Sequence, residues 1–173
     1  MNLANSITIT RMVLIIPFIL ILVSDLPYKS YIACALFFIL CLSDYIDGYV
    51  ARKKDQATSI GAMLDPLADK LLVSAALIFL IGKGVDAWMA YVIIAREFLI
   101  TGLRSFSHAV HKGDGMPARL SGKVKTVIQM LAIGAVILSL PYAYYLMLAA
   151  TIITIYSGLE YIWMQRKILS QTL

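Results

Sequence analysis

Six long apolar segments, separated by short stretches with charges, glycine or proline, dominate this sequence. They lie near residues 7–24, 30–52, 60–82, 86–104, 121–139 and 141–165. Each approaches or exceeds the roughly 20 helical residues that cross the hydrocarbon core of a membrane. Because backbone groups in lipid must form their hydrogen bonds internally, we expect helices. The sequence therefore predicts an all-α, polytopic membrane protein, with six transmembrane helices in one bundle and a single domain over residues 1–173.

The composition agrees with burial in lipid. Apolar residues make up 61% of the chain and the mean hydropathy is +0.84, whereas soluble domains contain roughly 45–50% apolar residues. Residues 12–23 are followed by no small-residue cleavage site, so we expect a retained first helix. Cys34 and Cys41 stand seven apart in one segment, too far along a helix to pair with each other, and are expected to be buried packing residues.

Lysine and arginine are distributed unevenly between the connecting stretches. With the N-terminus in the cytoplasm, only Lys29 and Lys83 fall on the opposite side. The cytoplasmic side collects Arg11, Arg52, Lys53, Lys54, Arg104, Lys112, Arg119, Lys123, Lys125, Arg166 and Lys167. Under the positive-inside rule, this asymmetry predicts a multi-pass membrane protein with both termini cytoplasmic. The net charge of +5 therefore indicates membrane topology and no nucleic-acid partner. Trp88 and nearby tyrosines are expected at the external interface.

Four aspartates stand where lipid-facing helices should carry no acid. Asp44 and Asp47 are three residues apart, and Asp65 and Asp69 are four apart, so each pair shares one side of its helix. The short connection at residues 53–59 makes the two helices antiparallel neighbours. Isolated charges in a membrane are costly, and the two basic residues within the helices cannot neutralise four acids. Oxygen-only ligands favour two Mg²⁺ or Mn²⁺ ions at an active site on the cytoplasmic side.

Two metal ions held by carboxylates suit displacement reactions at phosphorus, because they neutralise phosphate charge. Gly48 and Gly61 would let a phosphate or nucleotide approach the backbone closely. Small residues also permit tight helix packing in membranes, and this alternative stays open for both glycines. His108 and His111 fall in a predicted loop and are not expected to bind metal. The sequence thus favours a phosphoryl-transfer enzyme.

The run from Asp44 to Asp69 resembles the signature of the CDP-alcohol phosphatidyltransferase family. That signature reads D-x-x-D-G-x-x-A-R, eight residues, then G-x-x-x-D-x-x-x-D, and every defined position is present. The resemblance implies a six-helix enzyme of the bacterial plasma membrane, usually a homodimer, that binds CDP-diacylglycerol at its cytoplasmic side. Asp44, Asp47 and Asp65 would hold the metals. Asp69, close to or sharing a metal, would accept the proton of the acceptor hydroxyl while CMP leaves.

The resemblance also implies residues that bind the CDP-lipid. The N-terminal run 5–11 is similar to the N-x-x-T-x-x-R opening of bacterial members that make phosphatidylglycerol phosphate. Thr8 and Arg11 would then face the nucleotide, although Asn5 could simply cap the first helix. Contacts to the cytidine diphosphate portion are expected from Gly48, Ala51, Arg52 and, through close approach, Gly61.

Five basic residues and one acid lie between positions 104 and 125. A cytoplasmic loop that obeys the positive-inside rule would explain them without a ligand. The sharper hypothesis is a pocket for a phosphorylated acceptor, because arginine forks and lysine charges suit phosphate oxygens. This electrostatics would fit glycerol 3-phosphate or inositol phosphate, but not choline, ethanolamine or serine. The candidate residues are Arg104, Arg119, Lys123 and Lys125.

Residues 95–104 and 122–130 are similar to the family members that use glycerol 3-phosphate, which favours that acceptor and phosphatidylglycerol phosphate as product. Arg96 and Glu97 are adjacent, so we expect them to point in different directions and to pair with other helices, with Lys70 as one partner. Alternatives are a related synthase using inositol phosphate or phosphatidylglycerol, a small cation transporter, and a structural membrane protein. A transporter needs acids accessible from both sides, whereas these four lie near one side. A structural protein leaves them unexplained.

Overall fold

A computed structural model describes the backbone of residues 3–53, 70–110 and 120–172, and the side-chain burial of residues 9–43, 70–104 and 122–164. Within these ranges, the segment Lys70–Phe79 is helical and the only strand-type pairing is an isolated bridge between Ile81 and Val85. The remaining helices are α1 (Leu3–Val23), α2 (Lys29–Lys53), α4 (Ala87–Val110), α5 (Leu120–Ile137) and α6 (Ala143–Thr172). The expected all-helical fold is confirmed.

Three helices extend beyond the apolar segments that predicted them. α1 begins at Leu3 and not near residue 7, α4 continues to Val110 and not to 104, and α6 continues to Thr172 and not to 165. Apolar residues mark the part of a helix that can lie in lipid, whereas the backbone hydrogen bonds continue through polar residues of adequate helix propensity. The prediction that His108 lies in a loop is therefore wrong, because it belongs to α4; His111 lies outside the described residues.

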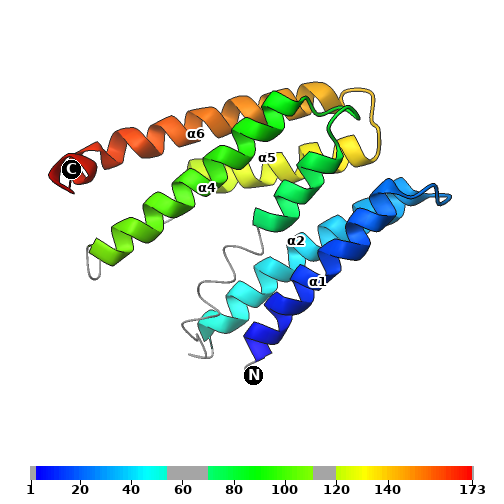
Figure 1. Cartoon of the computed structure of the whole chain (residues 1–173), viewed down its shortest axis with the longest axis horizontal. Helices are drawn as coiled ribbons and strands as arrows, with labels where there is room; N and C mark the ends of the chain where they lie inside the picture. The colour runs from blue at the N-terminus through cyan, green and yellow to red at the C-terminus, as the bar shows by residue number, and fades with distance from the viewer. Residues whose placement is uncertain (1–2, 54–69, 111–119, 173) are drawn as a thin grey trace.

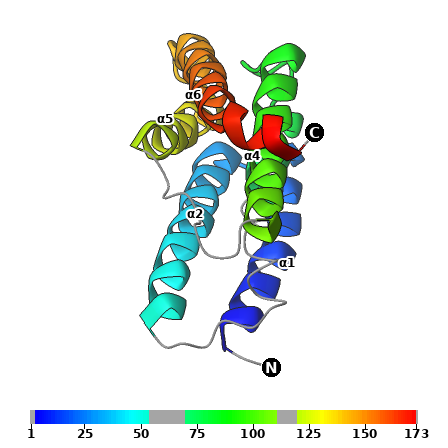
Figure 2. The same cartoon turned by 90° about the vertical axis from the view of Figure 1, so that its left-hand side faces the viewer.

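Successive helices run in alternating directions (Figure 1). The connections at residues 24–28, 80–86 and 138–142 lie at the same end of the bundle, on the right of Figure 1, and we name this the turn end. Both chain termini lie toward the other end, here named the terminal end. α1 packs against α2, α2 against α5, and α6 against both α4 and α5 (Figures 1 and 2). Helices far apart in the sequence, such as α4 and α6, are therefore neighbours.

The turn after α5 shows why a helix stops at this point. The backbone of Ser139 is left-handed, with φ of 54°. Its N–H donates to the carbonyl of Val136 at 2.9 Å, and the N–H of Leu140 donates to the carbonyl of Ala135 at 3.0 Å. This Schellman arrangement satisfies the last carbonyls of the helix. Pro141 follows and, because it has no N–H, favours the break that its position predicted.

Asp86 joins α4 to α6 at the turn end. Gly82 and Gly84, with φ of 79° and 115°, form the preceding turn in conformations that glycine adopts readily. The Oδ2 atom of Asp86 accepts hydrogen bonds from Trp88 Nε1 at 3.2 Å and from the hydroxyl of Tyr144 at 3.1 Å. Aromatic side chains at this end thus fasten two helices together.

Buried apolar side chains from all the described helices form one core. Phe18 of α1 and Phe37 of α2 are completely buried, with ring centroids 5.9 Å apart. A Cβ atom on Gly134 would lie 2.7 Å from the ring of Phe38, so glycine is required for α5 to approach α2 this closely. The thiol of Cys34 lies buried beside Gly134, as expected of a packing residue. Other fully buried members are Leu77, Met89, Ile93, Ile133 and Met147.

Large apolar side chains also cover the outside of the bundle, a pattern that soluble monomers rarely show. Examples on different helices are Leu20, Ile39, Leu99, Leu131 and Ile152. Among the described residues, the stretch Ala143–Met164 is long and apolar enough to cross a membrane, whereas Ile9–Val23, Lys29–Ser43 and Lys70–Phe79 are shorter apolar helices. The six-span topology stays a prediction.

Candidate active site

The predicted aspartate site begins on α2. The helix is continuous to Lys53, so the backbone positions of Asp44, Asp47, Gly48 and Ala51 fall on one side of it. The side chains of these residues, and of Arg52, lie outside those that the structure describes. Residues 54–69, which hold Gly61, Asp65 and Asp69, lie outside the described backbone as well. The four-aspartate metal site is therefore a prediction that the described residues do not test.

Of the two predicted nucleotide residues on α1, Arg11 is described in detail. Its side chain lies inside the bundle, at 3% exposure. Thr8 stands one turn earlier on the same helix, and its side chain is outside the described set. A buried guanidinium needs hydrogen-bonding or charged partners within the protein or from a ligand. The burial of Arg11 therefore places a charged group inside the bundle, just before the apolar part of α1.

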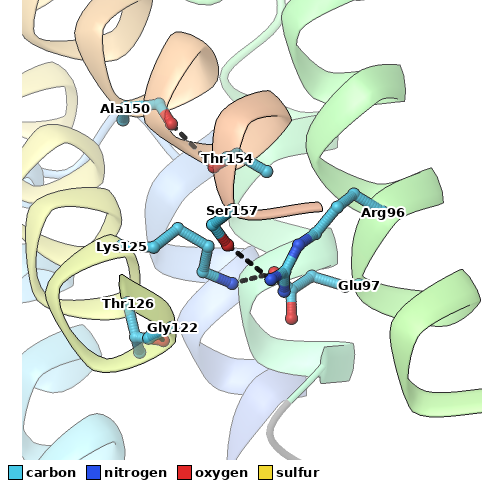
Figure 3. A network of polar contacts seen from close by, with 8 residues as sticks. All are labelled: Arg96, Glu97, Gly122, Lys125, Thr126, Ala150, Thr154 and Ser157. Atoms are coloured by element: carbon cyan, nitrogen blue, oxygen red, sulfur yellow. Dashed lines mark hydrogen bonds and ion pairs between the residues drawn. The ribbon is translucent and has the colours of Figure 1, made fainter. Parts of the chain in front are cut away.

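An ion-pair network connects α4, α5 and α6 (Figure 3). The ammonium group of Lys125, which is 3% exposed, contacts Oε1 of Glu97. Nη1 of Arg96 lies 3.4 Å from the same oxygen. Nη2 of Arg96 donates to the hydroxyl of Ser157 at 2.6 Å. The Glu97 carboxylate on α4 therefore contacts two cations, Lys125 and Arg96. Arg96 in turn forms a hydrogen bond to Ser157 on α6.

Among the described residues around Glu97, cations outnumber carboxylates. Lys70, at the start of the described part of its helix, lies close enough to Lys125 for the two ammonium groups to repel each other, and Arg96 repels Lys125 as well. We name Lys70, Arg96, Glu97 and Lys125 the cationic cluster; it contains three cations and one carboxylate among the described residues. Taken by themselves, these described charges would attract an anion, because low-dielectric walls strengthen their field.

The predicted acceptor residues divide between two locations. Arg104 is exposed on α4, with its guanidinium 5.8 Å from the ring centroid of Tyr161, and is near enough to Arg96 to repel it. Lys123 is exposed and, two residues from Lys125, points away from it on α5. Arg119 lies outside the described residues. The structure therefore brings Arg104 and Lys125 toward one region through Arg96, and it leaves Lys123 on another side of the helix.

Two expectations for Arg96 and Glu97 need correction. The prediction that they point apart is wrong, because long side chains on adjacent residues can bend toward each other, as their 3.4 Å contact shows. The expected pairing with other helices is confirmed, but Glu97 pairs with Lys125, and Arg96 with Ser157. Among the described residues, Lys70 acts on Lys125 through its charge.

Sequence reasoning missed the contribution of α6. A Cβ atom on Gly158 would stand 3.1 Å from Cγ of Arg96, so the glycine lets the arginine stem lie against the helix. The neighbouring Ser157 is 3% exposed and supplies the hydroxyl that fixes the guanidinium. Two small residues in succession on an apolar helix were the available signal, because such residues mark close contacts in membrane proteins.

The sequence over residues 1–156 matches the model of the CDP-alcohol phosphatidyltransferase family. A CDP-diacylglycerol–glycerol-3-phosphate 3-phosphatidyltransferase of Bacillus subtilis (strain 168) is 39% identical, covering 92% of this chain and 93% of the relative. A probable phosphatidylglycerophosphate synthase of Mycobacterium tuberculosis (strain ATCC 25618 / H37Rv) is 37% identical, covering 93% and 80%. A Haemophilus influenzae protein with the same name as the Bacillus relative is 34% identical, covering 94% and 88%. The chain therefore belongs to the CDP-alcohol phosphatidyltransferase family.

Proposed function

We propose that this chain transfers the phosphatidyl group of CDP-diacylglycerol to glycerol 3-phosphate, giving phosphatidylglycerol phosphate and CMP. The observation that carries this proposal is the similarity, over more than nine-tenths of the chain, to relatives named for that reaction. The cationic cluster supports a phosphorylated acceptor, because its surplus of positive charge would attract a phosphate and repel a cationic alcohol such as choline.

Members of this family generally depend on divalent metal ions. The donor set of this chain fits such ions, because Asp44, Asp47, Asp65 and Asp69 offer only carboxylate oxygens, which Mg²⁺ and Mn²⁺ prefer. The helical backbone of α2 supports the pairing of the first two, about one turn apart. When bound, two ions would neutralise the charge of the diphosphate and of the leaving CMP.

The remaining steps belong to side chains of this protein. Asp69 accepts the proton of the acceptor hydroxyl, whose oxygen forms a bond to the phosphorus of the phosphatidyl group. The bond from that phosphorus to the oxygen of CMP breaks, and CMP leaves with the electron pair. The buried position of Arg11 supports a role for it beside the nucleotide. The other nucleotide contacts are assigned to Thr8, Gly48, Ala51, Arg52 and Gly61.

The acceptor phosphate is assigned to Arg104, Arg119, Lys123 and Lys125. Lys125 has the strongest structural support, since a buried ammonium held by Glu97 is fixed in place before any ligand arrives. Preorganisation of this kind reduces the ordering that binding would otherwise require. Arg104 is steadied by the ring of Tyr161. Lys123 has the weakest support of the four, because it is exposed on another side of α5.

The placement in the membrane follows from the distribution of charge. We infer a six-span protein of the plasma membrane, a single catalytic domain over residues 1–173, and a homodimer. The terminal end, with the active site, faces the cytoplasm, and the turn end faces outward. The lysine and arginine asymmetry of the sequence supports this orientation. The exposed apolar side chains on every described helix support contact with lipid.

A lipid-labelling assay tests the proposal. Purified protein is mixed with CDP-diacylglycerol and labelled glycerol 3-phosphate, and label in the lipid phase is measured. We expect label with Mg²⁺ or Mn²⁺ and none in EDTA. Asp69→Asn should remove turnover while CDP-diacylglycerol binding persists, and Asp25→Asn, a change at an exposed turn residue, should preserve both. Labelling from inositol phosphate or phosphatidylglycerol, in place of glycerol 3-phosphate, would contradict the assigned acceptor.

A further inference from the structure

α5 carries a second buried polar side chain one turn beyond Lys125. Gln129 is 3% exposed. Four residues separate it from Lys125, so both side chains lie on the same side of the helix. The exposed residues Val124, Val127 and Leu131 mark the opposite side. Lys125 and Gln129 therefore face the interior of the bundle together.

The amide nitrogen of Gln129 lacks a partner within the part of the chain that the structure describes. Nε of Arg96 is also buried without a hydrogen-bond partner in that part of the chain, as is the Nε atom of Arg11, a residue that interacts through other atoms, whereas two buried hydroxyls on α6 are satisfied locally. The hydroxyl of Thr151 donates to the carbonyl of Met147 at 2.8 Å, and that of Thr154 to the carbonyl of Ala150 at 2.6 Å. A buried N–H without an acceptor is destabilising, and proteins rarely keep one without a reason. The position of Gln129 beside the proposed acceptor site indicates that its acceptor atom comes from a ligand.

We propose that Gln129 donates a hydrogen bond to the hydroxyl on the middle carbon of the acceptor, and so helps to select a glycerol-type chain. This inference rests on the proposed function. The acceptor phosphate binds at Lys125, and the carbon chain runs deeper into the bundle. Four residues advance about 6 Å along a helix, so a donor one turn beyond Lys125 lies within reach of a hydroxyl on the carbon chain of an acceptor whose phosphate binds at Lys125. The terminal hydroxyl is left for the attack on phosphorus.

The direction of this arrangement follows from charge. Lys125 lies in the first two turns of α5, nearer to the terminal end than Gln129. A doubly charged phosphate is best placed near water and the cationic cluster, whereas a neutral hydroxyl can enter a less polar region if a donor or acceptor meets it. An amide satisfies that condition without adding charge. Gln129 thus suits the uncharged part of the acceptor.

The test compares glycerol 3-phosphate with 3-hydroxypropyl phosphate, which lacks the middle hydroxyl. The variant Gln129→Met keeps the length of the side chain and removes its donor; Gln129→Leu is the second variant, should the first fail to fold. The matched control is Thr151→Val, which removes a buried hydroxyl that is already satisfied on α6. Each protein is assayed for kcat/KM with both acceptors, for KM of CDP-diacylglycerol, and for thermal unfolding.

We expect the unmodified enzyme and Thr151→Val to prefer glycerol 3-phosphate over the analogue by about tenfold, the value of one hydrogen bond to a buried group. Gln129→Met should use both acceptors almost equally, with KM of CDP-diacylglycerol unchanged and Tm no lower than in the control. An unchanged preference in Gln129→Met would overturn the inference. So would a raised KM for CDP-diacylglycerol alone, which would assign the amide to an ester oxygen of the lipid.

A large loss of Tm in both Gln129 variants would also overturn it, because that loss would reveal a partner within the protein. Failure of the unmodified enzyme to use either acceptor is a separate result. It would refute the proposed function, whereas the outcomes above concern enzymes that are active with glycerol 3-phosphate.

Discussion

The middle of the bundle and its turn end each place a carboxylate between helices, in opposite environments. Near the middle of α4, Glu97 is largely buried and contacts Lys125 and Arg96. At the turn end, Asp86 is exposed and accepts hydrogen bonds from the neutral donors Trp88 and Tyr144. Water screens an exposed contact, whereas a buried charge depends on its partner. Both contacts fasten helices together, but only the buried one creates a charged interior that can receive an ionic substrate.

The largest expected effect comes from Glu97→Gln. The change leaves the ammonium of Lys125 buried without its carboxylate, and removing one partner of a buried pair typically costs about 3–5 kcal/mol. We expect the free energy of unfolding to fall by this order, measured by denaturation in detergent. Glu97→Asp, which keeps the charge on a shorter stem, should retain more stability. Equal stability of Glu97→Gln and the unmodified protein would show that the buried contact at Glu97 and the exposed contact at Asp86 do not differ in energy.

The variant Lys125→Met distinguishes the contribution of Lys125 to acceptor binding from its contribution to the stability of the protein. The ammonium group is proposed to contact the acceptor phosphate, and hydrogen bonds to charged groups are worth about 1.5–3 kcal/mol. We therefore expect KM for glycerol 3-phosphate to rise about tenfold or more, with KM for CDP-diacylglycerol unchanged. Stability should fall less than in Glu97→Gln, since Arg96 remains beside the carboxylate.

The matched control is Lys83→Met, because Lys83 is an exposed lysine at the turn end. It should change neither KM. An equal rise of both KM values in Lys125→Met would remove the acceptor role and leave a purely structural one.

The variant Gly134→Ala tests the packing of α5 against α2 without changing any charge. The new methyl group would stand 2.7 Å from the far edge of the ring of Phe38, which is 37% exposed, so this ring must shift where α2 and α5 meet. Overpacking of this kind costs about 1–3 kcal/mol. We expect a lower Tm but unchanged KM values, in contrast to the Lys125 variant.

Gly102→Ala is the control for helix propensity, because no atom of the described residues lies within 4 Å of the position of its added methyl group. There the alanine should stabilise the helix by about 0.5–1 kcal/mol. A destabilised Gly102→Ala together with a neutral Gly134→Ala would contradict the packing of α5 against α2.

Asp86→Asn should have the smallest effect. The amide oxygen of asparagine can still accept from Trp88 or Tyr144, and the site is exposed to solvent. We expect no resolvable change in Tm and unchanged turnover. A loss of stability as large as that of Glu97→Gln would mean that exposed contacts at the turn end bear as much energy as buried ones.

The helices themselves could be predicted from the sequence, because long apolar runs have few other ways to satisfy their backbone in lipid. Their ends could not. Hydropathy has no information about where hydrogen bonding stops, so the extension of α4 to Val110 and of α6 to Thr172 was missed. The stop after α5 was better marked, since Pro141 follows the left-handed Ser139 directly.

The sequence indicated which types of residue form the site, but it indicated only some of the contacts between them. A basic acceptor region was expected, and Lys125 belongs to the cationic cluster that the structure shows. The pairing of Arg96 with Ser157 was not predictable, because it depends on α4 and α6 being neighbours although 61 residues separate the two side chains. The spacing of the aspartates on α2 follows from helix geometry alone, and so it could be read from the sequence.

The length of α6 has a consequence for where the chain ends. Its 30 residues form a rod about 45 Å long, half as long again as a hydrocarbon layer of about 30 Å. With its first turn at one face of such a layer, the rod stands out from the opposite face by more than two turns. A fluorophore fused to the C-terminus would then be held at a nearly constant height. Energy transfer from this fluorophore to a dye in the lipid headgroups would measure how deeply the protein is inserted in the membrane.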